Sequence, residues 1–394
     1  MTWKETHVMD ERLMFIAEWQ SGKKTISEVC REFGVSRKTG YKLIERYVAE
    51  GVDGLKDRSR APHHHPHAVS EEIEAAIVTM RVENPTWGPK KVKFVLARDV
   101  PGESWPAEST IGVILDRHGL VRRRRRRHRG VPSPSPLSPV AAANDVWGID
   151  FKGWFRTQDG SRCDPLTMTD LYSRYVLRLQ ALAKPDGDSV WPMVEAAFRE
   201  FGLPTRMRSD NGPPFASTGA GGLSQLSVKL VKAGVRPERI QPGKPQQNGR
   251  HERMHRTLKA ETASPPAESL RAQQRRFDNF RRVFNEVRPH EALGQQTPAT
   301  LFQPPSRPYC GRLKEPEYPS NHQVRRVRQN GEIKWEGTKV FLSEALIGEP
   351  VGIAEVDDGI YSVHFGMILL GHLDQAANFS KGNLPDPATN QPPT

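Results

Sequence analysis

Cysteine is scarce in this chain. Only three of the 394 residues are cysteines, and Cys30, Cys163 and Cys310 lie far apart along the sequence. They form no Cys-x-x-Cys pair and no zinc-ligand spacing, which argues against a structural zinc site. Sparse, unpaired cysteines of this kind fit a reducing cytoplasm.

Long hydrophobic runs are also missing. No apolar stretch reaches the roughly 18 residues that a membrane-spanning helix needs, and no signal-peptide pattern opens the sequence. We therefore expect no membrane partner and a cytoplasmic location.

Acidic residues are in deficit. The chain carries 46 aspartates and glutamates against 58 lysines and arginines, which gives a formal charge of +12. This excess predicts a polyanionic partner, with nucleic acid the first candidate, although a protein that is merely basic would show the same total. The length allows roughly two to four domains.

Two segments separate the expected domains: DRSRAPHHHPH at 57–67 and RRRRRRHRGVPSPSPLSP at 122–139. Unpaired charge is too costly to bury, so the arginine run cannot enter a core, and the Pro–Ser alternation favours a stiff, extended linker. The histidines of the first segment could bind a metal, but a proline-broken linker explains them equally: His63, His64, His65 and His67. The arginines of the second would contact phosphates without reading sequence, unless they are simply solvated: Arg122, Arg123, Arg124, Arg125, Arg126 and Arg127.

The resulting division has six parts. We expect a first helical domain at 1–60, a second at 68–121, the linker at 122–140, an α/β core at 141–305, a small β-barrel at 306–380 and a disordered tail at 381–394.

Residues 8–50 have the pattern of a helix-turn-helix. A helix start is expected at Thr25 or Ser27, and the turn Gly34-Val35-Ser36 supplies a serine that can cap the next helix. The expected apolar faces are Ile26, Val29, Cys30 and Phe33 on the first helix, and Tyr41, Ile44 and Val48 on the second.

The start of that second helix is the expected DNA reader. Gly40 is an unusual residue there, since glycine costs about 1 kcal/mol relative to alanine in a helix. The alternative is a small helical hairpin with a solvated basic face. The expected DNA contacts are Arg37, Lys38, Thr39, Tyr41 and Lys42.

Residues 68–121 predict a second helix-turn-helix-like module. Residues 70–99 have the pattern of a capped helix, a Pro-Thr-Trp-Gly turn and a basic helix. Lys90 and Lys91 of the basic helix are expected to contact DNA. A helical spacer between the DNA reader and the core is the alternative.

Residues 145–265 change to alternating strands and helices. The strand candidates are 146–155, 165–172, 175–182, 205–210 and 235–240. The helix candidates are 188–202, 224–234 and a segment from about Asn248. Three strands followed by helix, strand, helix, strand and helix predict a mixed five-stranded sheet with flanking helices.

The remaining segments complete the predicted fold. Residues 269–287 form an amphipathic helix with one apolar stripe, made of Phe277, Phe280, Phe284 and Val287. Beyond 306, short strands separated by glycine turns predict a small barrel.

Three carboxylates stand at the ends of different elements. Asp150 interrupts an apolar strand, Asp210 ends another strand before Asn211-Gly212, and Glu252 begins a helix. Converging carboxylates repel one another and need a divalent cation, and oxygen ligands favour Mg²⁺ or Mn²⁺. Singly, each acid has an ordinary structural explanation, so only their combination indicates a site.

Several blocks of this sequence resemble a known family. Three segments resemble the catalytic blocks of the DDE transposases of bacterial insertion sequences, which are related to retroviral integrases. They are WGIDFKG (147–153), RSDNGPPF (208–215) and QQNGRHERMHRTLK (246–259). FNEVRPHEALGQQTPA (284–299) is similar to the block that follows that core. Three further segments resemble the N-terminal part of one integrase-like family: GVSRKTGYKLIERY (34–47), GLKDRSRAPHHHPH (54–67) and NPTWGPKKVKFVLA (84–97). The resemblance covers about residues 20–305, and the C-terminal barrel resembles the end domain of some integrases more weakly.

The resemblance implies an RNase H-like core in which Asp150, Asp210 and Glu252 hold two Mg²⁺ ions, with Mn²⁺ as a substitute. The family usually has about 35 residues between its second and third acids, and residues 217–225 are expected to add a surface loop here, which costs little. In this chain 41 residues stand between Asp210 and Glu252. Of the competing acids, Glu238 precedes the loop before the third block and Glu261 lies roughly two to three turns beyond Glu252.

Cations surround the third acid. Glu252, His255, Arg256 and Lys259 stand at i, i+3, i+4 and i+7, which predicts one helix face that holds metal and grips the flanking phosphates. A surface helix with ordinary ion pairs is the alternative. The DNA contacts expected near the site are Asn211, Arg250, His255, Arg256 and Lys259.

These expectations together describe a transposase. Its helical modules would bind the terminal inverted repeats of a mobile element, and its core would cut a phosphodiester and use the freed 3′-hydroxyl to attack target DNA. We expect double-stranded DNA and a second copy of the chain as partners, at least a dimer, no nucleotide cofactor, and a location at the bacterial nucleoid. The alternatives are a catalytically silent, sequence-specific DNA-binding regulator and a metal-dependent nuclease without joining activity.

Overall fold

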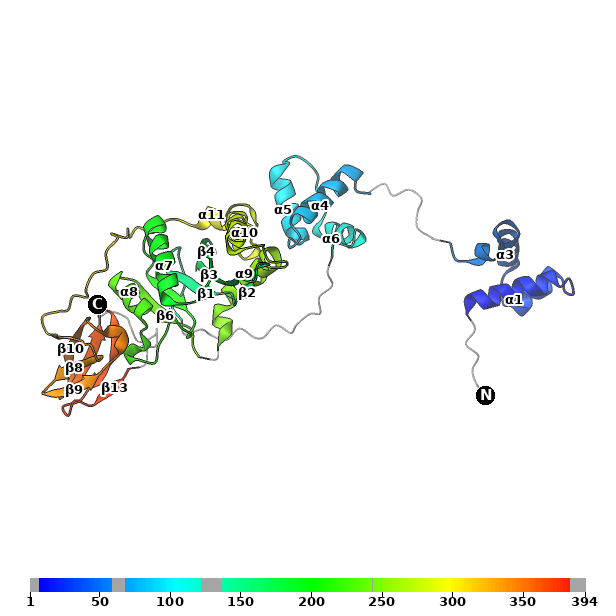
Figure 1. The fold of residues 1–394 in the computed structure, drawn as a ribbon. Helices are drawn as coiled ribbons and strands as arrows, with labels where there is room; N and C mark the ends of the chain where they lie inside the picture. Colours follow the sequence, from blue (N-terminus) through cyan, green and yellow to red (C-terminus); the bar gives the residue numbers. More distant parts are fainter. Residues whose placement is uncertain (1–6, 59–67, 122–136, 243, 383–394) are drawn as a thin grey trace, which may run out of the picture. The chain divides into compact units, whose positions relative to one another are not determined.

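The computed structural model describes residues 7–58, 68–121, 137–242 and 244–382. They belong to two compact units, Met1–Val69 and Ser70–Thr394, each described here by itself (Figure 1). The expectations for His63–His67, for Arg122–Arg127 and for the tail beyond Gly382 lie outside the described residues. Within the described ranges, no helix combines the length and apolar character needed to cross a membrane.

The first unit is a helix-turn-helix. Its elements are α1 (Val8–Gln20), α2 (Ile26–Glu32), α3 (Arg37–Glu50) and the 3₁₀ turn η1 (Gly51–Leu55). Thr25 and Glu28 form a capping box at the start of α2, and the Ser36 side chain accepts a hydrogen bond from the backbone N–H of Thr39 at the start of α3. Both predicted helix starts are confirmed.

Gly40 permits close packing of the three helices. A Cβ atom at this position would lie 2.4 Å from Cys30 Sγ on α2 and 3.1 Å from Phe15 Cζ on α1, so no larger residue fits without movement. The expected apolar face of α3 is partly wrong, because Tyr41 and Val48 are exposed. Ile44 packs against the core as predicted, and Leu43 and Tyr47 take the places of the other two.

The second unit begins with three helices, α4 (Glu71–Glu83), α5 (Pro89–Asp99) and α6 (Glu108–Arg117). The Ser70 side chain accepts from the backbone N–H of Ile73 and so caps α4. Ile77, Trp87, Val92 and Ile111 are buried among them, as expected for a helical module with its own small core.

A mixed sheet forms the centre of the second unit. Its strands are β1 (Val146–Phe151), β2 (Phe155–Arg156), β3 (Arg162–Asp170), β4 (Val176–Leu182), β5 (Arg206–Ser209) and β6 (Arg236–Arg239). The order is β4-β3-β1-β5-β6, with the short β2 paired to the start of β3. β3 is antiparallel to β1 and β4, whereas β1, β5 and β6 run parallel. The predicted five-stranded RNase H-like sheet is confirmed, and β2 is an addition that the sequence did not predict.

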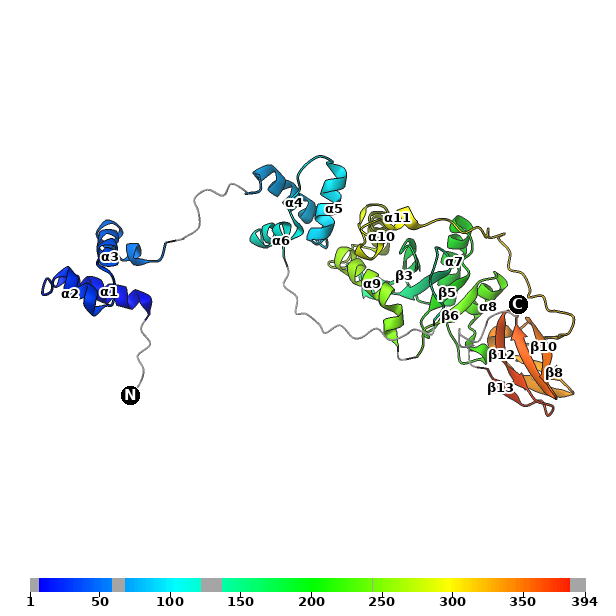
Figure 2. The same cartoon turned by 180° about the vertical axis from the view of Figure 1, so that it is seen from behind.

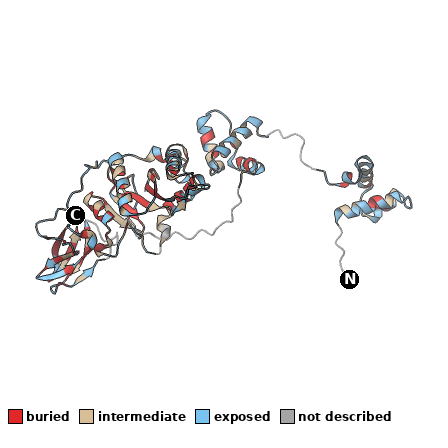
Figure 3. Cartoon of the chain, in the orientation of Figure 1, coloured by how far each residue is buried: buried red, intermediate tan, exposed pale blue. Residues whose placement is uncertain are grey.

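Helices cover both faces of this sheet (Figures 1 and 2). On one face, Trp147, Ile149 and Met168 pack with α7 (Gly187–Phe201) and α8 (Gln225–Lys232). On the other, Cys163, Val176 and the neighbouring strand residues pack with α9 (Gly249–Thr262) and α10 (Leu270–Arg282). Figure 3 shows the buried residues concentrated in the strands between these helices. The short elements η4 (Val283–Val287), η5 (Glu291–Leu293) and α11 (Pro298–Leu301) follow α10.

The C-terminal region is a five-stranded antiparallel sheet with a separate hairpin. The sheet order is β13-β12-β11-β10-β7, with strands β7 (Gln323–Arg326), β10 (Pro350–Asp357), β11 (Ile360–Phe365), β12 (Ile368–Leu373) and β13 (Phe379–Lys381). The hairpin is β8 (Glu332–Trp335) and β9 (Thr338–Phe341), followed by the turn η6 (Glu344–Leu346). This arrangement is consistent with the predicted small barrel.

The segment expected to be an extra surface loop is exposed at its ends, Ser217, Thr218 and Gln225, but buried in its middle. It contains the turn η2 (Ala220–Gly222), where Ala220 is fully buried and its N–H donates to Leu342 O at 3.2 Å. Ala220 and Leu223 share one hydrophobic cluster with Ile368 and Leu370 of β12. The sequence did not predict this burial, because the partner of the segment lies more than a hundred residues further along the chain.

Candidate active site

Asp150 and Asp210 lie at the same end of two neighbouring strands. β1 pairs in parallel with β5, with Val146 opposite Arg206 and Gly148 opposite Arg208. Continuing that register places Asp150 level with Asp210, just beyond the last paired residues. The carboxyl ends of parallel strands are where open α/β sheets place their ligand sites.

The surroundings of Asp150 disfavour its charge. Burial, followed by the nearby charge of Asp210, raises the pKa of Asp150 to about 7. The Asn248 side chain donates a hydrogen bond to Asp150 Oδ2 at 2.8 Å, which favours the ionised form but does not offset those effects. A cation between the two aspartates would remove the repulsion.

The helix that carries Glu252 is fixed to the sheet by two histidines. His251 lies against Gly148, where a Cβ atom would come within 2.4 Å of its ring, and its Nε2 is 3.2 Å from Thr169 Oγ1. His255 Nε2 is 2.7 Å from Thr167 Oγ1. Gly148 and Asp150 pair with Thr169 and Thr167 across β1 and β3, so this face of the sheet is polar where α9 crosses it.

His255 is not the phosphate-binding cation that the sequence predicted. It is 5% exposed, and burial, then His251 and Lys152, lower its pKa to about 2, so the ring is neutral. Because the Thr167 hydroxyl donates to Asp150 O, His255 Nε2–H donates to Thr167 and leaves the Nδ1 lone pair 3.9 Å from Asp150 Oδ2. The i+3 position turns toward the sheet because Thr167, distant in sequence, offers it a partner.

Glu252 is exposed on the first turn of α9. It lines a hollow of about 680 Å³ together with Lys152, His255, Arg256 and Lys259. All four residues of the predicted shared face therefore border this hollow, although the His255 side chain is buried. The structure does not gather Glu252 with the two aspartates: among the residues it describes, no group of three or more His, Cys, Asp or Glu side chains is arranged to hold a metal.

The other acids near the third position have structural partners. Glu238 accepts from Arg208 Nε at 2.6 Å, and both side chains are nearly buried. Glu261 accepts from Arg288 Nη1 at 2.7 Å. Neither is free to replace Glu252.

The remaining predicted DNA contacts differ in their surroundings. Five are exposed at the start of α3: Arg37, Lys38, Thr39, Tyr41 and Lys42. Lys90 pairs with Glu291 at 3.3 Å, and Lys91 is partly buried. Asn211 donates its side-chain amide to Ile240 O at 2.7 Å. Arg250 lies in α9, but its side chain is outside the described part of the structure.

Sequence reasoning missed the polar residues that support the site. Asn248, His251, Thr167 and Thr169 contact Asp150 or hold α9, yet none was selected. The i, i+4 spacing of His251 and His255 was the available indication, since it places both rings on one helix face. Their threonine partners could not be identified, because the register of β3 is a property of the folded sheet.

Sequence comparison identifies families along most of the chain. The family described as Integrase core domain matches residues 140–245, and a second family with the same description matches 233–298. Residues 11–63 match a Helix-turn-helix domain and residues 39–115 a Homeodomain-like domain. Residues 322–380 match the C-terminal domain of IS481 family transposases.

Two relatives come from bacterial insertion elements. An uncharacterized 31.7 kDa protein of insertion element IS407 from Burkholderia multivorans is 27% identical over 236 residues, which are 59% of this chain and 82% of that protein. An uncharacterized 39.2 kDa protein of insertion element IS476 from Xanthomonas euvesicatoria is 28% identical over 236 residues, 59% of this chain and 65% of that protein.

Solved structures of viral integrases overlap with the chain at low scores. The simian T-cell lymphotropic virus intasome, in complex with a PP2A regulatory subunit, gives a TM-score of 0.37 at 15% identity over 74% of this chain and 97% of that one. The catalytic core of BIV integrase gives a TM-score of 0.31 at 18% identity, over 40% of this chain and 93% of that one. Together, the sequence matches support a transposase of a bacterial insertion sequence, of the integrase superfamily.

Proposed function

We propose that this DNA-binding transposase catalyses metal-dependent DNA cleavage and strand transfer with Asp150, Asp210 and Glu252. The observation that carries the proposal is the position of the two aspartates at the carboxyl ends of adjacent parallel strands, close enough for Asp210 to raise the pKa of Asp150. An integrase core in a transposase supports polynucleotidyl transfer as the reaction type.

The chemistry of the donor set fits magnesium. Asp150 and Asp210 offer carboxylate oxygens, the ligands that Mg²⁺ prefers, and integrase cores are typically metal-dependent. A pair of such ions activates the attacking hydroxyl and stabilises the leaving oxygen of a phosphodiester. Glu252 would join the two aspartates as third ligand, with Mn²⁺ able to substitute.

Polar and basic residues of this chain surround the proposed metal site. Asn248 donates a hydrogen bond to Asp150 Oδ2, which would orient this carboxylate while leaving it lone pairs for an ion. Residue 248 directly precedes α9, so this contact links Asp150 to the first turn that carries Glu252. Lys152, Arg256 and Lys259 around the Glu252 hollow would hold the phosphates on either side of the scissile bond.

The rest of the chain would place the DNA. The exposed start of α3 would read the terminal inverted repeats, and two copies of the chain, at least, would pair the element's ends before they attack target DNA. We propose that the protein acts at the nucleoid in the bacterial cytoplasm.

The test is a joining assay with labelled element ends, a plasmid target and Mg²⁺. Asp150→Asn, Asp210→Asn and Glu252→Gln should each abolish cleavage and joining while end binding persists. The matched control is Asp358→Asn, in the exposed turn between β10 and β11. Wild-type joining by any of the three variants would refute the triad.

The two alternatives give different products. Cleaved ends without joined products would indicate a nuclease, and repeat-specific binding with neither product would indicate a regulator. All three acids are present in this chain, which favours the enzyme over a silent derivative.

A further inference from the structure

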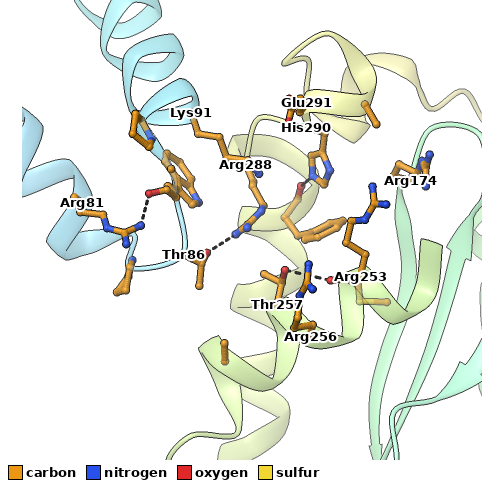
Figure 4. Close-up of a pocket in the computed structure, with 18 of the residues that line it drawn as sticks. Arg81, Thr86, Lys91, Arg174, Arg253, Arg256, Thr257, Arg288, His290 and Glu291 are labelled. Carbon is orange, nitrogen blue, oxygen red and sulfur yellow. Dashed lines mark hydrogen bonds between the residues drawn. The ribbon is translucent and has the colours of Figure 1, made fainter. Parts of the chain in front are cut away.

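A second hollow lies along the face of α9 next to the face that carries Glu252. It has a volume of about 870 Å³ and is bounded by the turn before α5, by α9 and by residues 284–292 (Figure 4). Thr86 and Arg288 close one side through a 2.9 Å hydrogen bond. Arg256 lines both this hollow and the one that contains Glu252.

Positive charge dominates this second hollow. Among the described residues, two carboxylates line it, and both are engaged: Asp170 accepts from Asn144 and Ser173, and Glu291 pairs with Lys90. The six cationic side chains that line it are Arg81, Lys91, Arg174, Arg253, Arg256 and Arg288.

Three of these cations have no carboxylate partner in the described structure. Arg288 pairs with Glu261 and Arg81 donates to backbone carbonyls, but across the described residues no ion pair forms with Lys91, Arg253 or Arg256. These three come from two different elements, α5 and α9. Cations that line one hollow without a direct ion pair can bind an anion there.

The titration of nearby groups agrees with this geometry. Burial and then the charge of Arg288 lower the pKa of Lys91 to about 8, although Glu261 and Glu291 act in the opposite direction. His290, which also lines the hollow, has a pKa lowered to about 3, chiefly by burial and then by the charges of Lys91 and Arg288, and is neutral. The positive charge in the hollow thus lowers the pKa of both groups.

We propose that this hollow binds a backbone phosphate of DNA through Lys91, Arg253 and Arg256. The inference rests on the proposed function, because it extends the path of the DNA strand from the Glu252 hollow to the adjacent face of α9. Arg253 follows Glu252 directly, and successive helix residues point about 100° apart. One strand crossing α9 would thus contact the Glu252 hollow and this second hollow, with Arg256 between them.

Salt-dependent binding tests the proposal in the full-length protein. In EDTA, where no joining occurs, Lys91→Gln combined with Arg253→Gln should flatten the dependence of log K on log[salt] for an element-end duplex by about 1, since each phosphate contact contributes about 0.9. The control is Arg275→Gln, on the exposed side of α10, which should leave the slope unchanged. Equal slopes for the double variant and wild type would overturn the proposal.

Chemical labelling of Lys91 tests it without substitution. Because its pKa is about 8, its amine should react with an acylating reagent at pH 8 faster than ordinary lysines, whose pKa is near 10.4. Duplex DNA should protect it, whereas inorganic phosphate at equal phosphate concentration should not.

Protection by inorganic phosphate alone would overturn the DNA assignment in favour of a free-anion site, and no protection by either would overturn the proposal altogether. Failure of the joining assay with intact protection would instead count against the proposed function only.

Discussion

Replacing Asp150 by asparagine should stabilise the metal-free fold at neutral and alkaline pH while it abolishes the proposed reaction. The pKa of Asp150 is raised from 3.8 to about 7, so the folded state keeps a proton that the unfolded state releases. The folded protein binds more protons between these two values, and its stability therefore falls as pH rises from about 4 to 7. Asparagine carries no charge at any pH and removes this loss.

The expected magnitude follows from the two pKa values. Each unit corresponds to 1.36 kcal/mol, and the raised pKa of this mostly buried carboxyl makes the full effect about 4 kcal/mol above pH 7. The free energy of unfolding of the asparagine variant, relative to that of wild type, should thus be about 4 kcal/mol higher at pH 8 than at pH 4. At roughly 2 °C per kcal/mol, the unfolding midpoint would rise by roughly 8 °C.

Thermal unfolding in EDTA at pH 4, 6 and 8 measures this effect. Asp358→Asn, in an exposed turn, is the matched control and should show no comparable gain. Adding Mg²⁺ at pH 8 should stabilise wild type and leave the Asp150 variant unchanged, because an ion that binds only the folded state adds RT ln(1 + [L]/Kd). Identical pH profiles for wild type and the variant would show that Asp150 is not held in a desolvated, anionic environment.

Three further results are expected. Gly40→Ala should destabilise the first unit by about 1–2 kcal/mol in thermal unfolding, because overpacking against Cys30 outweighs the gain in helix propensity. The control is Gly112→Ala in α6, where the added Cβ would make only an ordinary contact at 3.6 Å and the change should be neutral or stabilising. Arg208→Met should cost about 3–5 kcal/mol, because the nearly buried Glu238 carboxylate loses its cation and keeps only the hydrogen bond from the Ser138 N–H. A Glu238→Gln background should recover much of that loss in denaturant titrations. Arg37→Ala should weaken binding to terminal repeats more than binding to random DNA in mobility-shift assays, and equal losses on both would make α3 a phosphate contact rather than a reader.

The elements of the core were predictable because their sequences satisfy local rules. The apolar positions of α7 recur at helical spacing and end at Gly202, whose φ of 89° suits glycine, and the Ser224 cap at the start of α8 could be read in the same way. The two aspartates were predictable as strand ends. None of these inferences required knowledge of a distant partner.

The predictions that failed depended on contacts between distant segments. His255 occupies a position at the edge of the charged face of α9, and only Thr167 on β3 decides that its ring turns inward. Tyr41 fits the apolar pattern of α3 but lies outside the area that α1 and α2 cover. The joint positioning of Lys91 and Arg253 depends on the packing of α5 near α9, which no local pattern encodes.

The turn at Ala220–Gly222 makes the C-terminal sheet a structural support of the α/β core rather than an appendage. Leu223, Val228 and Val231 are buried against residues of that sheet, and at roughly 1.5–3 kcal/mol for each such side chain their burial contributes about 5 kcal/mol or more. A protein truncated after residue 305 would expose this patch to water. We expect such a fragment to aggregate, so truncation experiments would report lost solubility before they could report any role of the sheet in handling DNA.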